Sequence, residues 1–398
     1  MKIGIFLDEW ADGGVPVFLK RLEGKLTNQG HHVVFFLLRP HGKRAPVARR
    51  LFEKLKATLR DRCVSLDMDS FPRHWRKSHF VKTLVGSGIE CLLINQFRSS
   101  LPYLEAIAGS IPLISISHTD SDYYYHEFLL TEQMTAAHIA VSDAIYRQCA
   151  AFAAPERSHR IHSIPYGVEA SDAFIPALDG PLSVIYCARL DHLQKRCRDL
   201  VPIWEKYLAL GGTGRLTIIG TGQAIGYLTE TLKKQVDAGQ VVFCHHLPAE
   251  EVAAKMARGD VLLNISNFEG LPQTVLEGAN LGLYPLLSDI ESGHRQIVES
   301  LQAGTLCRIG DTSAFAHELL RLEKDLPGLR HQRSRIREWT LQHHSLEKCV
   351  LRYAAVMEGV RKIAPQISQV TAHQPSLRER AARVYLLARY RRYYPAIA

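Results

Sequence analysis

Short apolar segments alternate with longer amphipathic segments along most of the chain. The apolar segments that we predict as strands span residues 2–7, 32–38, 90–95, 111–117, 184–188, 215–219, 241–244, 260–265 and 284–288. They are rich in Val, Ile, Leu and Phe and show little polar alternation, which is typical of strands buried on both faces of a parallel sheet. Helical patterns lie between them. We therefore predict an α/β chain made of repeated strand–helix units.

The series of strands is interrupted once, near the middle of the chain. Residues 171–181 are rich in Pro, Asp and Gly, which is typical of a linker. We predict a first domain at 1–170, a linker at 171–181 and a second domain at 182–345. From Asp311 to about Ile363 the pattern is helical, and 364–398 form a tail whose part from 377 to 394 predicts a basic amphipathic helix.

The stretch from Asn264 to Glu277, with the sequence NISNFEGLPQTVLE, combines a strand end, an acidic turn and a helix start. Proline has a fixed φ and no N–H, so Pro272 suits the first position of a helix that continues to Asn280. The amides of Gln273, Thr274 and Val275 would then be exposed at the positive end of that helix. This arrangement predicts an anion site, with phosphate as the anion we expect.

Two carboxylates flank this predicted anion site. Glu269 lies in the turn before the helix, and Glu277 lies about 7 Å along the helix axis from Pro272. A ligand with a central diphosphate would reach both residues. The alternative is that Glu277 is an acid favoured by the helix dipole and Glu269 a solvated loop residue.

Glu269-x7-Glu277, with Gly270 and Pro272 inside it, resembles the signature of the retaining GT-B glycosyltransferases of family 4. Three further motifs match the family pattern and occur in the same order along the chain. They are Gly13-Gly14, Arg189 with Lys195, and Ser288-Asp289. The chain departs from the family pattern at Tyr166, at Cys244 or His245, and at Gln296, where asparagine, glycine and glutamate are usual. The resemblance covers most of residues 1–363 and is most specific from Val184 to Gly293.

The resemblance implies two Rossmann-like, doubly wound domains that face a cleft, with a helix at 346–363 crossing back to the first domain. It implies a retaining, metal-independent transfer from a nucleotide diphosphate sugar, and a UDP-sugar is the donor we expect, without a cofactor. The implied catalytic residues are His118, Glu269, Arg189 and Lys195. The implied donor-binding residues are Gly13, Gly14, Gly220, Leu271, Gln273, Thr274, Val275 and Glu277.

Each of these assignments has a simpler alternative in the sequence alone. Arg189 and Lys195 follow a strand, where two cations can clamp a diphosphate, but solvated basic turns are also common. His118 could be a polar residue at the rim of a sheet, and Gly13-Gly14 an ordinary turn. The pair Asp120-x-Asp122 resembles a metal motif of the other glycosyltransferase class, yet short acidic pairs recur by chance, and we expect no metal.

The charge of the chain is the feature of its composition that predicts a class of partner. The net charge is +9, with thirteen Lys or Arg against four acids between Arg39 and Lys82, and six Arg against one Glu between Leu377 and Arg392. Such clusters suit a glycan or glycolipid acceptor at an anionic membrane surface. No nucleic-acid motif with interleaved aromatic residues accompanies them.

Location and function class are also predicted from features of the sequence. The amino-terminal apolar run is too short for a signal peptide, and the eight scattered cysteines suggest reduced thiols, so we expect a cytoplasmic protein that can bind the inner membrane face. Two other classes stay open: a non-hydrolysing sugar-nucleotide epimerase of the same fold and a non-catalytic binding subunit.

Overall fold

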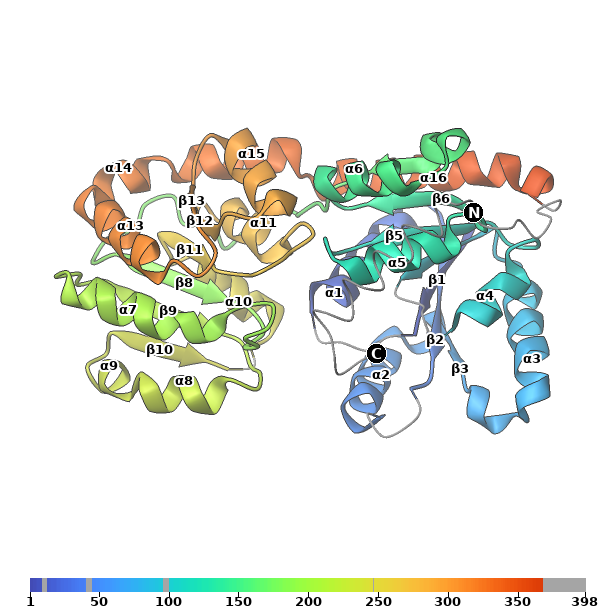
Figure 1. Ribbon diagram of the computed structural model, residues 1–398, viewed down its shortest axis with the longest axis horizontal. Helices are drawn as coiled ribbons and strands as arrows, with labels where there is room; N and C mark the ends of the chain where they lie inside the picture. The colour runs from blue at the N-terminus through green and yellow to red at the C-terminus, as the bar shows by residue number, and fades with distance from the viewer. Residues whose placement is uncertain (9–12, 41–44, 96–99, 246, 368–398) are drawn as a thin grey trace. The chain divides into compact units, whose positions relative to one another are not determined.

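The structure is a computed structural model, and it describes residues 1–8, 13–40, 45–95, 100–245 and 247–367. The chain divides into two compact units (Figure 1). The first comprises Met1–Pro165 and the chain from Cys349 onward, and the second comprises Tyr166–Lys348. The predicted tail from 368 to 398, including the basic amphipathic helix, lies outside the described residues.

The first unit contains a seven-stranded parallel sheet in the order β3-β2-β1-β4-β5-β6-β7. Its strands are β1 (Lys2–Leu7), β2 (His32–Leu38), β3 (Cys63–Leu66), β4 (Cys91–Asn95), β5 (Leu113–Ser117), β6 (Thr135–Ala140) and β7 (Ile161–Ser163). Its helices are α1 (Gly14–Asn28), α2 (Ala45–Leu59), α3 (Arg73–Gly86), α4 (Leu101–Ile107), α5 (Asp122–Thr131) and α6 (Asp143–Phe152).

The second unit contains a six-stranded parallel sheet in the order β10-β9-β8-β11-β12-β13. Its strands are β8 (Ser183–Cys187), β9 (Arg215–Ile219), β10 (Val241–Cys244), β11 (Val261–Asn264), β12 (Tyr284–Ser288) and β13 (Thr305–Cys307). Its helices are α7 (Leu200–Ala209), α8 (Ile225–Thr231), α9 (Lys233–Asp237), α10 (Ala249–Met256), α11 (Gln273–Asn280), α12 (Gln296–Leu301), α13 (Thr312–Lys324), α14 (Leu326–His331) and α15 (Arg333–His343). The predicted α/β class with two parallel sheets is confirmed.

The residues of the central strands explain why these sheets form. Every residue of β4, β5, β11 and β12 is buried, because helices cover the sheets and the strands have no solvent face. Strands β8 and β11 are neighbours in the second sheet. Since both are parallel, their carboxyl ends and the loops that follow them lie at the same edge, which is where ligands bind in such sheets.

The last helix, α16 (Leu346–Ile367), continues from the second unit into the first. Within the first unit its residue Tyr353 is buried against Phe18 of α1, with ring centroids 5.7 Å apart, and Arg361 forms an ion pair with Glu90 at 2.9 Å. The second unit begins at Tyr166, before the predicted linker, because the Val168 amide donates to the carbonyl of His344 at 2.7 Å.

A fully buried guanidinium stabilises the second unit through hydrogen bonds to backbone carbonyls. Arg333, at the start of α15, donates hydrogen bonds of 2.6 to 3.2 Å to backbone carbonyls of the linker, α10 and α11 regions. The four acceptors are Ile175, Ala257, Gly259 and Leu281. Ala257 and Leu281 are the C-cap residues of α10 and α11, where carbonyls have no partner within the helix. Burial lowers the pKa of Arg333 from its ordinary value.

Candidate active site

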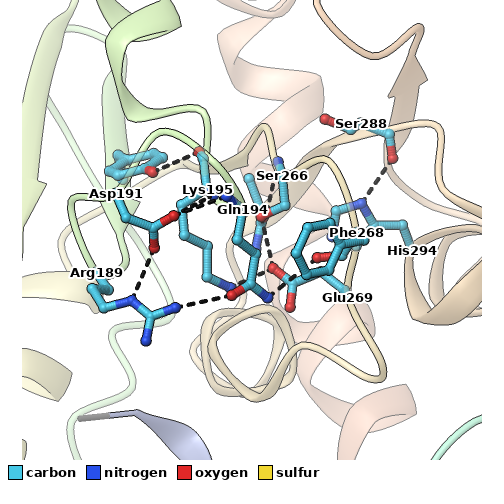
Figure 2. A network of polar contacts seen from close by, with 11 residues as sticks. Arg189, Asp191, Gln194, Lys195, Ser266, Phe268, Glu269, Ser288 and His294 are labelled. Atoms are coloured by element: carbon cyan, nitrogen blue, oxygen red, sulfur yellow. Dashed lines mark hydrogen bonds and ion pairs between the residues drawn. The ribbon is translucent and has the colours of Figure 1, made fainter. Parts of the chain in front are cut away.

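The loop after β8 carries the two predicted cations. The Arg189 guanidinium donates to Asp191 at 2.9 Å and to the side-chain oxygen of Gln194 at 3.0 Å (Figure 2). Asp191 also accepts from the amide of Gln194 at 2.8 Å. Burial alone would raise the pKa of Asp191, but these hydrogen bonds and the charge of Arg189 hold the pKa below its ordinary value. The loop is therefore held by an ionised carboxylate.

The loop after β11 carries Glu269, which is 5% exposed. Lys195 forms an ion pair with Glu269 Oε1, and the hydroxyl of Ser266 donates to the same oxygen at 2.7 Å. The other carboxylate oxygen, Oε2, accepts no hydrogen bond from the described residues. Figure 2 shows Lys195 and Ser266 converging on this carboxylate from different segments. Two donors on one oxygen fix the carboxylate and leave the second oxygen for a ligand.

The charge of Glu269 is maintained by its surroundings. Burial alone would raise the pKa of this carboxyl group, but the charge of Lys195, the imidazole of His294 and the two hydrogen bonds together lower it. Glu269 is therefore ionised at neutral pH and paired with a cation. A buried pair of this kind is stable only when its geometry and hydrogen bonds offset the cost of removing both charges from water.

Helix α11 begins one residue later than predicted, because Pro272 precedes the helix with an extended ψ of 107°. The Val275 amide donates to the Pro272 carbonyl at 3.0 Å within the first turn. The prediction that this amide is exposed for an anion is therefore wrong. Gln273 and Thr274 stay half-buried at the helix start, and Leu271 is buried with 2% of its surface exposed.

A tight turn packs against the segment between Glu269 and α11. This turn, Glu291–Arg295, contains Gly293 with φ of 77°, where a β-carbon would lie 2.6 Å from the carbonyl oxygen of Gly270. The Ser292 hydroxyl donates to the same Gly270 carbonyl at 2.9 Å. Glycine at 293 is required by both its conformation and its close contact. The turn thus supports the loop that carries Glu269.

His294, in that turn, is fully buried, and its Nδ1 lies 2.7 Å from the carbonyl of Ser288 (Figure 2). Because a carbonyl only accepts, Nδ1 carries the proton, and Nε2 is a buried acceptor without a partner among the described residues. Burial lowers the pKa of His294, although the charge of Glu269 opposes that shift. The sequence indicated no role for this residue.

Two predicted donor-binding residues in the second unit lie around this network. Gly220 follows β9 with φ of 137°, and a β-carbon there would lie 2.0 Å from the carbonyl oxygen of Ala188, the residue before Arg189. Gly220 therefore permits close contact between two loops at the sheet edge. Glu277 is half-buried on α11, about one turn from the helix start at Gln273.

The first unit holds the remaining predicted residues. His118, just after β5, is 4% exposed, and its Nε2 lies 2.7 Å from Oδ1 of Asn95 at the end of β4. Burial lowers the pKa of His118 to about 3, so the imidazole is neutral at physiological pH. Gly13 and Gly14 are exposed at the start of α1, and a β-carbon on Gly13 would meet no atom within 4 Å.

The structure thus brings Arg189, Lys195 and Glu269 into one network, together with residues that the sequence did not single out. Those residues are Asp191, Gln194, Ser266 and His294. A polar residue directly after a buried strand was the only sequence signal for Ser266. Over the described residues, no group of three or more His, Cys, Asp or Glu is arranged to hold a metal ion, and no helix is long and apolar enough to span a membrane.

Residues 181–325 match the family model of glycosyl transferases group 1. Over 166 residues the chain is 25% identical to N-acetyl-alpha-D-glucosaminyl L-malate synthase of Bacillus anthracis, covering 42% of each chain. Over 216 residues it is 28% identical to lipopolysaccharide 1,6-galactosyltransferase of Escherichia coli K12, covering 52% of this chain and 56% of that protein. The chain thus spans about half the length of these curated relatives.

Solved structures match over a larger share of the chain. The Anabaena protein HepE in complex with UDP matches with a TM-score of 0.71 and 14% identity, covering 90% of this chain and 100% of HepE. The lipopolysaccharide outer core galactosyltransferase WaaB matches with a TM-score of 0.67 and 20% identity, covering 90% and 99%. The chain has the GT-B fold of these structures, and residues 181–325 of its second unit are similar to the glycosyl transferases group 1 family.

Proposed function

We propose that this protein is a retaining glycosyltransferase that moves a sugar from a nucleotide diphosphate sugar, most simply a UDP-sugar, to a hydroxyl group of an acceptor. The observation that carries the proposal is the buried Lys195–Glu269 pair at the strand ends of the second unit, joined through Gln194 to Arg189. The group 1 family match and the UDP complex of HepE support a nucleotide-sugar donor.

In the proposed reaction, the bond between the anomeric carbon of the sugar and a diphosphate oxygen breaks. Arg189 and Lys195 stabilise the negative charge that develops on the departing diphosphate, together with the amides of Gln273 and Thr274. The acceptor oxygen forms the new bond on the same face of the sugar, and its proton passes to the departing diphosphate. In this proposal the cations neutralise the diphosphate without a metal ion.

The carboxylates and the histidine orient the donor in this proposal. Glu269 Oε2 accepts a sugar hydroxyl, because Oε1 is already held by Lys195 and Ser266. Glu277 binds the ribose hydroxyls, and neutral His118 binds the sugar as a hydrogen-bonding group rather than as an acid. Gly13, Gly14 and Gly220 allow backbone atoms to approach the donor or acceptor.

The test is turnover of nucleotide sugars by the purified protein with radiolabelled UDP-, GDP- and ADP-sugars. We expect hydrolysis or transfer with one of them and no activity in Glu269→Ala. If no nucleotide sugar is hydrolysed or transferred, and Glu269→Ala supports the same glycan in cells as the wild type, the proposed activity is wrong. Anomeric analysis of the product distinguishes retention from inversion.

For the acceptor, we propose a phosphorylated glycan or glycolipid of the cell envelope at the inner membrane face. Two relatives with matching sequence act in lipopolysaccharide synthesis by name. In the first unit, helix α3 exposes Trp75 with 61% of its surface accessible, and the same helix carries the exposed Lys77 and Lys82. An exposed aromatic ring among cations suits an anionic membrane interface.

The membrane part of this proposal is tested by sedimentation with vesicles of anionic and neutral lipid. We expect binding to anionic vesicles that weakens with salt. Truncation at Pro375 and the variant Trp75→Ser separate the contribution of the tail from that of α3. Equal binding to neutral and anionic vesicles would contradict the role of the basic clusters.

A further inference from the structure

Gln194 forms hydrogen bonds with both loops of the candidate active site. Its side-chain oxygen accepts from Arg189 at 3.0 Å, and its side-chain nitrogen donates to the carbonyl of Phe268 at 3.3 Å. Its backbone amide donates to Asp191 at 2.8 Å, and its backbone carbonyl accepts from the amide of Asn267 at 2.7 Å. Figure 2 shows this side chain between the guanidinium and the loop that carries Glu269.

The chemistry of these contacts requires a side chain that both accepts and donates. The guanidinium of Arg189 only donates, and the carbonyl of Phe268 only accepts. A carboxylate would satisfy Arg189 but not Phe268, and an apolar side chain would satisfy neither. Because Phe268 directly precedes Glu269, the same amide group fixes the cation and the loop that carries the carboxylate.

We propose that Gln194 is a positioning residue that directs the Arg189 guanidinium toward the donor diphosphate and aligns it with Glu269. This inference rests on the proposed function, since it assigns the diphosphate as the ligand of Arg189. A guanidinium held by Asp191 and Gln194 is aligned before the donor binds, so little side-chain freedom is lost on binding. Without Gln194, the Arg189 guanidinium loses one of these two acceptors and keeps Asp191.

A matched control separates this role from simple fastening of the two loops. Asn267 also joins them, because its side-chain nitrogen donates to the carbonyl of Leu193 at 2.6 Å and its oxygen accepts from Arg196 at 3.0 Å. Neither contact involves Arg189. Asn267→Ala therefore loosens the same two loops and leaves the guanidinium contact in place, whereas Gln194→Met keeps the side-chain volume and removes the contact.

The experiment is calorimetric titration of wild type, Gln194→Met and Asn267→Ala with UDP and UMP, or with the GDP or ADP pair if that base binds. We expect Gln194→Met to weaken the diphosphate about tenfold, because a hydrogen bond that aligns a charged group is lost. The monophosphate, which lacks the second phosphate, changes by less than about twofold. Asn267→Ala leaves the ratio of the two affinities unchanged.

Three outcomes would overturn the inference. Equal weakening of diphosphate and monophosphate in Gln194→Met, or the same change of the diphosphate-to-monophosphate affinity ratio in Asn267→Ala, would show that Gln194 only fastens the loops. Because each result is a ratio of affinities in one folded variant, a lower melting temperature does not affect it. If wild type binds none of the three diphosphates, the nucleotide part of the proposed function fails as well, which the other two outcomes do not imply.

Discussion

A polar pair at the strand ends of the first sheet differs in charge from the pairs at the strand ends of the second. In the first unit, His118 and Asn95 form a neutral pair, since burial lowers the pKa of the histidine to about 3. In the second unit, Lys195 and Glu269 form a charged pair, and Arg189 and Asp191 form another. A neutral pair recognises hydroxyl groups, whereas cations stabilise a departing diphosphate. This difference in charge is why we propose that the second unit binds the leaving group.

The largest expected effect comes from neutralising the carboxylate of the charged pair. Glu269→Gln keeps the side-chain volume and the hydrogen bond from Ser266 but removes the charge that pairs with Lys195. We expect kcat for sugar transfer to fall by about 100-fold or more, as for loss of a preorganised polar group at a reacting centre. Steady-state kinetics with the donor that turns over provides the measurement.

Glu318→Gln is the matched control for this variant, because Glu318 pairs with Arg321 at 2.6 Å elsewhere in the second unit. Its kcat should stay within about twofold of wild type, since the hydrogen-bond partners of Glu318 are Thr305 and Arg321, which lie outside the candidate active site. If Glu269→Gln and Glu318→Gln have the same kcat, the Lys195–Glu269 pair has a structural role and not a catalytic one.

We expect Arg333 to stabilise the second unit without taking part in ligand binding, unlike the charged residues of the candidate active site. Arg333→Met leaves the carbonyls of Ala257, Gly259, Leu281 and Ile175 without this donor. We expect the free energy of unfolding of the second unit to fall by about 3 kcal/mol, measured by urea titration. The nucleotide affinity of the folded variant should be unchanged. A large loss of nucleotide affinity would contradict a purely structural role for Arg333.

The neutral histidine of the first unit predicts a pH dependence of stability. The pKa of His118 falls from 6.5 to about 3 on folding, so the unfolded chain binds more protons between these values. The stabilising contribution is complete above pH 6.5 and is lost progressively as the pH falls toward 3. The expected slope is about 1.4 kcal/mol per pH unit, and His118→Asn should remove that share.

Urea titrations between pH 7.5 and 5 measure this slope in the wild type and in His118→Asn. The pKa of His138 is also lowered to about 3 by burial, so part of the slope should remain in the variant. Identical slopes in the two proteins would mean that His118 titrates normally and that the pair with Asn95 is not neutral.

The smallest expected effect on stability comes from Gly13. Its backbone is extended, with φ of 168°, and a β-carbon would meet no atom within 4 Å. Gly13→Ala should change the free energy of unfolding by less than about 0.5 kcal/mol. A fall in kcat/KM at unchanged stability would support a close ligand there, whereas unchanged kcat/KM would leave Gly13-Gly14 as an ordinary turn.

The strands that the sequence predicted correctly share a physical property. Strands β1, β2, β9 and β10 are mostly apolar in a pattern that no helix period explains, so the pattern located them to the residue. The pattern did not identify β6, with the sequence TAAHIA, because Ala and His have no strong strand preference. Pairing of β6 with β5 and β7 and burial on both faces decide its structure.

The sequence predicted those residues of the candidate active site that can be recognised from their type and their position after a strand. Arg189, Lys195 and Glu269 were selected by a family resemblance, and the structure places Lys195 against Glu269 across 74 residues of chain. The roles of Gln194 and Ser266 depend on how two loops approach each other, which no local pattern encodes. The Val275 prediction was wrong because the first helical turn closed with its own hydrogen bond.

The most direct test of the charged strand end is calorimetric titration of wild type and Lys195→Met with UDP, GDP and ADP. We predict that one diphosphate binds the wild type and that Lys195→Met binds it at least about tenfold more weakly, because the variant lacks a cation beside the diphosphate. Equal affinity of the two proteins for that diphosphate would contradict the assignment of the leaving group to the second unit.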